Sequence, residues 1–130
     1  VGALALPWDE RFDRAHLNVP SFGHHPLRLT LPCVGSGEAV RGYQQQTGRA
    51  LATLRYFDAA VAARHLHIPM HIAAARFDPA VPPPGQFAIY NALAGHRELF
   101  VLQAGHFDHA GIVAENSRLL DALAYFFNSA

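Results

Sequence analysis

Two apolar runs in the second half of the chain each lead into a titratable residue. Met70–Phe77 ends at Asp78, and Glu98–Leu102 is followed closely by His106. A proline-rich turn and an amphipathic segment over residues 83–93 lie between them, which predicts a strand, a helix and a second strand. Parallel strands joined in this way end at the same edge of a sheet, about 4.8 Å apart when they are neighbours. We therefore expect the carboxylate and the imidazole to come within hydrogen-bonding reach of each other.

The rest of the chain also alternates between short apolar runs and amphipathic segments. The sequence predicts a buried strand over Val1–Leu6, then a helical turn that Asp9 caps and that reaches Leu17. An irregular segment rich in Pro and Gly follows over Asn18–Gly37. Three helices are predicted after it: Glu38–Gln46, which Gly48 interrupts, Ala50–His65, which has an apolar stripe, and the amphipathic Ile112–Phe127. Such alternation is typical of the α/β class, in which helices flank a parallel sheet.

Three strands are too few for a complete sheet of this kind. Parallel sheets are normally large and covered, and a three-stranded one leaves both of its edges open. We therefore expect residues 1–130 to be one partial domain, the distal half of a larger sheet. Its partner at the open edge would be a missing N-terminal half or another subunit.

Charge and composition exclude several classes of function. The formal net charge is zero, and the ten Arg are scattered without a basic run, which argues against a nucleic-acid or anionic membrane surface. The chain has no Lys, so a Schiff-base mechanism is excluded. Cys33 is the single cysteine and allows no internal disulfide. No apolar run reaches the roughly 18 residues of a membrane-spanning helix.

Two further patterns have a fixed spacing. Residues 78–91 read Asp, three variable residues, Pro-Pro, three further residues and Phe-Ala-x-Tyr-Asn, and residues 54–58 read Leu-x-Tyr-Phe-Asp. Both resemble segments of the acetyl xylan esterase and cephalosporin C deacetylase family of α/β-hydrolases, in which the Leu-x-Tyr-Phe-Asp segment also comes before the other. Residues 4–7 show a weaker similarity to the family's strand after the nucleophile helix. The resemblance implies that this chain is the C-terminal half of such a hydrolase.

By this resemblance, Asp78 is the acid and His106 the base of a Ser-His-Asp triad. A serine hydroxyl needs a base to remove its proton, and the base needs a carboxylate on its other ring nitrogen. The order acid before base agrees with α/β-hydrolases, where the nucleophile comes first. None of the four serines lies in a G-x-S-x-G motif, and Ser36 and Cys33 both lie in the irregular segment. We therefore expect the nucleophile outside this chain and the chain alone to be inactive.

The resemblance also implies the remaining properties of the protein. It implies an esterase that acts on acetyl esters of sugars or cephalosporin-like compounds, needs no cofactor or metal, and is cytoplasmic and homo-oligomeric. Phe107 stands where the family usually has Glu, and Val81 where it usually has Cys. These departures leave the acid and the base in place and set the chain apart from the characterised members of the family.

Three alternatives to this interpretation stay open at this point. Asp108 and His109 lie near enough to His106 to replace it if the register shifts. A non-catalytic interaction module derived from a hydrolase would keep the same packing without the reaction. A metal site is the third alternative, with candidate ligands at His24, His25, His65, His67, His71, His106 and His109.

Overall fold

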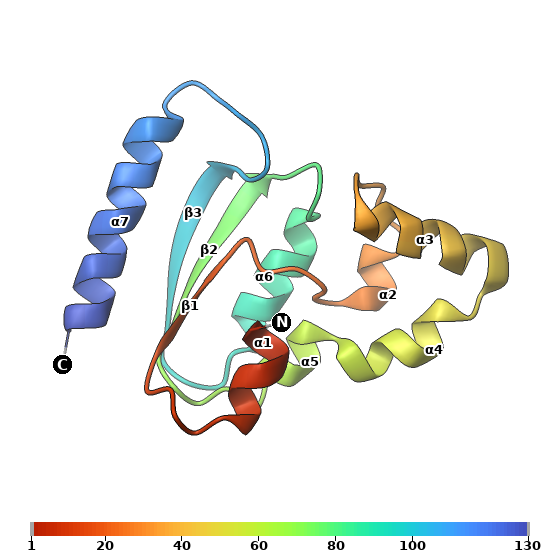
Figure 1. Cartoon of the computed structure of the whole chain (residues 1–130), viewed down its shortest axis with the longest axis horizontal. Helices are drawn as coiled ribbons and strands as arrows, with labels where there is room; N and C mark the ends of the chain where they lie inside the picture. The colour runs from red at the N-terminus through yellow and green to blue at the C-terminus, as the bar shows by residue number, and fades with distance from the viewer. Residues whose placement is uncertain (1, 130) are drawn as a thin grey trace.

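The computed structural model describes residues 2–129 and contains a three-stranded parallel sheet (Figure 1). The strands β1 (Ala15–Asn18), β2 (Met70–Phe77) and β3 (Arg97–Ala104) lie in the order β1-β2-β3. Because β2 pairs in parallel with both neighbours, all three carboxyl ends meet at one edge. The α/β class is confirmed.

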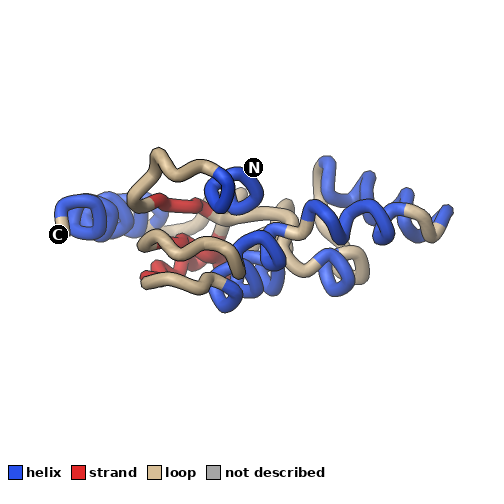
Figure 2. The backbone as a smooth tube through the Cα atoms, turned by 90° about the horizontal axis from the view of Figure 1, so that it is seen from below, coloured by secondary structure: helices blue, strands red, loops and turns tan. Residues whose placement is uncertain are grey.

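Helices lie on both sides of this sheet, as Figure 2 shows from below. They are α1 (Gly2–Ala5), the 3₁₀ turn η1 (Leu6–Trp8), α2 (His25–Arg28), α3 (Ser36–Thr47), α4 (Ala50–Leu54), the 3₁₀ turn η2 (Arg55–Phe57), α5 (Ala59–Ala63), α6 (Pro83–Ala92) and α7 (Ile112–Asn128). The helices α2, α3 and α4 extend away from the sheet, beyond α5 and α6. Within residues 2–129, no helix has the length and apolar character that crossing a membrane requires.

Successive side chains of β2 point to opposite faces of the sheet and contribute to two separate hydrophobic cores. Met70, Ile72 and Ala74 point to one face and pack with residues of α1, α5 and α6. Ala73 and Ala75 point to the other face, where residues of α7 and β3 cover them. All five side chains are completely buried, as expected for a central strand with helices on both faces.

Two predictions for the N-terminal segment are wrong. The predicted strand over Val1–Leu6 is instead α1 followed by η1, with Val1 itself outside the described residues. A short apolar run does not separate strand from helix, and here Ala3 is buried against α5. The predicted helical turn from Asp9 to Leu17 is also wrong, because residues 9–14 are irregular and β1 begins at Ala15. Ala15 and Val19 donate backbone hydrogen bonds to Pro69 and Ala73 beside them.

The predicted helix over Ala50–His65 is broken into three parts. Asp58 is extended, and its side chain accepts a hydrogen bond from the backbone N–H of Ala60, so it ends the preceding turn and caps α5. The later elements agree better with prediction, since β2 has the predicted bounds and α6, β3 and α7 differ from them by three residues at most. The predicted stop of the first long helix at Gly48 is also confirmed.

Candidate active site

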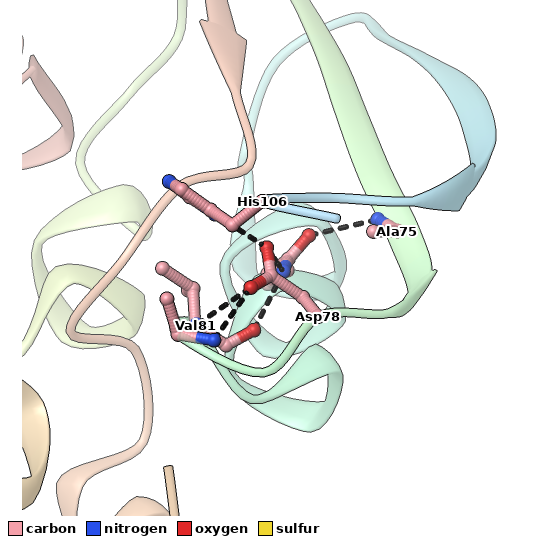
Figure 3. A network of polar contacts seen from close by, with 6 residues as sticks. Ala75, Asp78, Val81 and His106 are labelled. Atoms are coloured by element: carbon pink, nitrogen blue, oxygen red, sulfur yellow. Dashed lines mark hydrogen bonds and ion pairs between the residues drawn. The ribbon is translucent and has the colours of Figure 1, made fainter. Parts of the chain in front are cut away.

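Asp78 and His106 meet at the carboxyl edge of the sheet. Phe77 at the end of β2 is in register with Ala104 at the end of β3, so the two loops leave the sheet side by side. The N–H of Gly105 donates to the carbonyl of Phe77 at 2.8 Å and ties the loops together. Asp78 Oδ2 then lies 2.9 Å from His106 Nδ1 (Figure 3).

Four N–H donors surround the carboxylate of Asp78. Its Oδ1 accepts hydrogen bonds from the backbone of Ala80 at 2.9 Å and of Val81 at 2.8 Å. Its Oδ2 accepts from Gln86 Nε2 at 3.3 Å and from His106 Nδ1. The side chain is wholly buried, so these donors hold the carboxylate in a single orientation.

His106 presents its second ring nitrogen away from this network. With Nδ1–H donating to Asp78, the neutral imidazole leaves Nε2 as an acceptor. Figure 3 shows Nε2 on the side of the ring away from Asp78, and the side chain is 48 % exposed. His106 also adopts a left-handed backbone conformation with φ of 48°, which is costly for a residue with a side chain. A base held by an acid and open on its other nitrogen can take a proton from a nearby hydroxyl group.

Gly105 allows the close approach of the two loops. A Cβ atom at this position would lie 2.3 Å from Asp78 Oδ2 and 2.9 Å from Val19 Cγ1. Any side chain would therefore push the carboxylate away from His106.

Gln86 is a residue of this site that the sequence interpretation missed. Its Oε1 accepts a hydrogen bond from the N–H of Ala75 in β2, and its Nε2 donates to Val81 O and to Asp78, so it joins the strand, the turn and the acid. It is fully buried. Its signal in the sequence is a polar residue on the same helical stripe as the buried Ile89 and Leu93.

A strained loop borders the site from the end of β1. Val19, Phe22 and His24 have positive φ values of 40°, 64° and 56°, and His106 is the only other non-glycine residue with positive φ among residues 2–129. The carboxylate of Asp58 holds this loop by accepting hydrogen bonds from the N–H groups of His24 and His25, at 2.9 and 2.7 Å. Strained backbone that is held in this way is typical of functional loops.

The competing residues lie elsewhere or make no contact with the pair. His109 Nε2 lies 3.3 Å from Glu115 Oε2 instead of approaching Asp78. Ser36 borders the same small pocket as His106, but no hydrogen bond joins them. In the described part of the chain, His, Cys, Asp and Glu residues form no group of three or more suited to a metal ion.

Comparison with known proteins agrees with this architecture. The chain resembles a solved acetyl xylan esterase from Paenibacillus sp. R4, with 24 % identity and a TM-score of 0.74 over 93 % of this chain and 42 % of that one. It also resembles acetyl xylan esterase 1 from Thermoanaerobacterium sp. JW/SL YS485, with 18 % identity and a TM-score of 0.67 over 94 % of this chain and 42 % of that one. A third similar structure is DcsB in complex with a substrate analogue, with 14 % identity and a TM-score of 0.58 over 95 % and 59 %.

These likenesses establish the fold, and the chain spans less than half the length of either esterase. No curated protein matches the sequence. The family described as Acetyl xylan esterase (AXE1), however, matches residues 39–123, which is well over half of the chain. The matched region includes both Asp78 and His106, and the chain therefore belongs to the acetyl xylan esterase family.

Proposed function

We propose that this chain supplies the acid and the base of a Ser-His-Asp triad in a carboxylesterase that removes acetyl groups from sugars or cephalosporin-like compounds. The observation that carries the proposal is the 2.9 Å contact between Asp78 Oδ2 and His106 Nδ1, with the opposite ring nitrogen free. Membership of the acetyl xylan esterase family supports the ester chemistry.

In the proposed reaction, His106 Nε2 takes the proton of a serine hydroxyl as the serine oxygen attacks the ester carbonyl. Asp78 keeps the imidazole in the required tautomer and stabilises the imidazolium that forms. His106 then returns the proton to the leaving alcohol, and an acetyl-serine remains. Water, deprotonated in turn by His106, cleaves this ester, so acetate leaves and the serine is restored.

The serine of this reaction would come from outside residues 1–130. Two serines of the described chain, Ser21 and Ser36, share a pocket with His106. Neither is hydrogen-bonded to the imidazole. The backbone N–H groups that stabilise the oxyanion would also come with that serine. We therefore propose that residues 1–130 alone do not catalyse ester hydrolysis, and that the serine-bearing segment adds to the sheet beside the edge strand β1.

The test compares the 130-residue chain with a longer protein that includes the coding sequence upstream of Val1. We expect the longer protein to hydrolyse 4-nitrophenyl acetate in a reaction that a serine reagent blocks, and the short chain to show no such turnover. In the longer protein, His106→Asn and Asp78→Asn should each lower kcat by about 10³-fold or more. His96→Asn is the matched control, because His96 is exposed at the opposite end of β3.

A non-catalytic interaction module is the second candidate. The open edge of β1 and the lack of a serine bonded to His106 favour it. An upstream sequence without a serine nucleophile, or a longer protein that His106→Asn leaves fully active, would replace the esterase proposal with this one. The cytoplasmic location and the homo-oligomer stay predictions, which fractionation of cells and sedimentation of the longer protein would test.

A further inference from the structure

A small pocket next to His106 contains a buried guanidinium group without a partner. The pocket has a volume of about 230 Å³ and is bordered by Arg28, Phe22, Ser36, Gly37 and His106, among others. Arg28 is only 5 % exposed, and its side chain forms no hydrogen bond or ion pair with any described residue. The atom Nη1 is completely buried and unpaired.

An unpaired buried cation is unusual, because burial of a charge without a partner opposes folding. The ring of Phe22 lies 4.8 Å from the guanidinium carbon, but it offers a π-face and no hydrogen-bond acceptor. The nearby acid in α3, Glu38, is already occupied. Arg41 and the N–H of Cys33 both bind the carboxylate of Glu38 and hold its pKa at about 2.

The N-terminus of α3 faces the same pocket. Gly35 precedes this 12-residue helix and provides no side-chain cap, so the first N–H groups, those of Ser36 and Gly37, have no acceptor within the helix. A Cβ atom on Gly37 would lie 2.2 Å from Arg28 Nη2, so the guanidinium packs directly against this first turn. Two independent groups, a buried cation and a set of free N–H donors, therefore point to the same ligand chemistry.

We propose that Arg28 and the first turn of α3 bind an anionic oxygen group, a carboxylate or a phosphate, next to the base His106. A guanidinium fork matches two such oxygens, and a helix N-terminus favours negative charge. A pocket of about 230 Å³ holds one substituent rather than a whole substrate. For the substrate, this means an ester that carries a negative charge beside the bond that is cleaved. This inference rests on the proposed esterase function.

Binding is tested without any reaction, by titrating ¹⁵N-labelled 130-residue chain and following its amide resonances by NMR. We expect succinate or inorganic phosphate to shift the amides of Ser36 and Gly37 and the signals of His106 in a saturable way, and neutral succinamide to leave them in place. Saturation by either anion supports the site, and the tighter of the two identifies the preferred group. Equal shifts with succinamide would overturn the proposal.

Variants separate the guanidinium from the helix terminus. Arg28→Met should weaken binding at least tenfold, whereas Arg49→Met, which changes an exposed arginine at the start of α4, should not. Ser36→Pro removes one of the N–H groups that would bind the anion, and it should therefore weaken binding. Since Ser36 is the first residue of α3, the helix loses no hydrogen bond, and this variant can be tested even if Arg28→Met fails to fold. Ser36→Ala controls for loss of the hydroxyl group. The proposal would be wrong if Ser36→Pro binds the anions with unchanged affinity and Arg28→Met either does the same or fails to fold.

The longer protein decides whether the site is free in the complete molecule. If succinate and phosphate bind the 130-residue chain but not the longer protein, another part of that protein fills the pocket, and the proposal is wrong. Because these titrations need no hydrolysis, their outcome stays distinct from success or failure of the esterase assay. If both succeed, 4-acetoxybenzoate should be hydrolysed in preference to its methyl ester, and Arg28→Met should reduce that preference about tenfold.

Discussion

At the residue scale, the orientation of the Asp78 carboxylate depends on Gln86 and Gly105, two residues without a charge. Gln86 fixes one oxygen from the side of α6, and Gly105 leaves room for the imidazole to reach the same oxygen. Neither residue could take part in proton transfer. Both therefore allow the geometry of the Asp78–His106 pair to be changed without removing either residue.

Gln86→Glu tests the first of these contacts. The substitution keeps the size of the side chain but replaces the amide donor with an oxygen that faces Val81 O and Asp78 Oδ2. Repulsion at this fully buried position should reduce the free energy of unfolding at pH 7 by about 3 kcal/mol or more. Urea denaturation measures the change, and Gln45→Glu on the exposed face of α3 should stay within about 0.5 kcal/mol of the parent. Equal values for the two variants would contradict the role of Gln86.

Gly105→Ala tests the close approach. The added methyl group would overlap Asp78 Oδ2, so we expect a loss of about 1 to 3 kcal/mol in the free energy of unfolding and slower hydrolysis by the longer protein. Gly42→Ala is the control, since no atom lies within 4 Å of the added Cβ and the site is inside α3. There the same change should stabilise by about 0.5 to 1 kcal/mol. Changes of the same sign in both variants would show that the space at Gly105 is not limiting.

At the element scale, Asp58 decides where one helix ends and the next begins. It caps α5, and the same carboxylate accepts the N–H groups of His24 and His25 in the strained loop. The Asp58 side chain therefore stabilises both the start of α5 and the loop that borders the site.

Asp58→Ala should consequently disturb both elements. The loss of three hydrogen bonds to a buried carboxylate should lower the free energy of unfolding by at least about 2 kcal/mol. Hydrogen exchange of the amides of His24 and His25 should also accelerate. Asp121→Ala, on the exposed side of α7, should change stability by less than about 0.5 kcal/mol. Unchanged exchange at His24 and His25 would show that Asp58 does not hold the loop.

The strands β1 and β2 are joined by a pair of histidines. His16 Nδ1 lies 3.0 Å from His71 Nδ1, and the ring of His71 packs beside Phe100 and Phe126. Burial lowers the pKa of both imidazoles from their usual value near 6.5, and the neighbouring charge of His71 lowers that of His16 further. The carboxylate of Glu98 in β3 raises the pKa of His71 but less than burial lowers it.

The unfolded chain therefore binds protons more readily than the folded chain just below pH 6.5. Stability should fall as the pH drops through that region and level off below the folded pKa values. Urea denaturation at pH 7.5 and pH 5.0 measures the fall. His16→Gln should make it smaller, because burial lowers the pKa of His16, His25 and His71 and one of these three groups no longer titrates. His67→Gln, which changes an exposed histidine outside the pair, should keep the full loss. An equally steep fall in His16→Gln would rule out the pair as its cause.

The elements that the sequence predicted well owe their structure to nearby residues. The run of β2 and the prolines before α6 define their own boundaries, and the positions of Asp78 and His106 follow from the strands that they leave. β1 was missed because its strand conformation depends on the carbonyls of Pro69 and Ala73, more than 50 residues away. Gln86 lies on the apolar stripe of its helix, but its partners in β2 and in the turn, like the lack of a partner for Arg28, depend on contacts that the sequence does not reveal.

At the scale of the whole molecule, the sheet and its last helix leave unpaired surface. β1 pairs only with β2, and α7 exposes Val113, Leu120 and Tyr125. In a parallel ladder alternate residues bond to the neighbouring strand. The N–H of Ala15 donates to Pro69, directly before β2, and that of Val19 donates to Ala73 within it. The amides of His16 and Asn18 therefore face the open edge.

Hydrogen exchange at this edge tests whether the proposed serine-bearing segment pairs with β1. In the 130-residue chain the amides of His16 and Asn18 should exchange much faster than those of Ala15 and Val19, which are bonded to β2. In the longer protein we expect protection of all four amides, because an added strand would accept the outer pair. Measurement of the short chain at two concentrations separates this from self-association, which would protect the outer amides only at the higher one. Outer amides that still exchange rapidly in the longer protein would place the serine-bearing segment elsewhere than at the edge of β1.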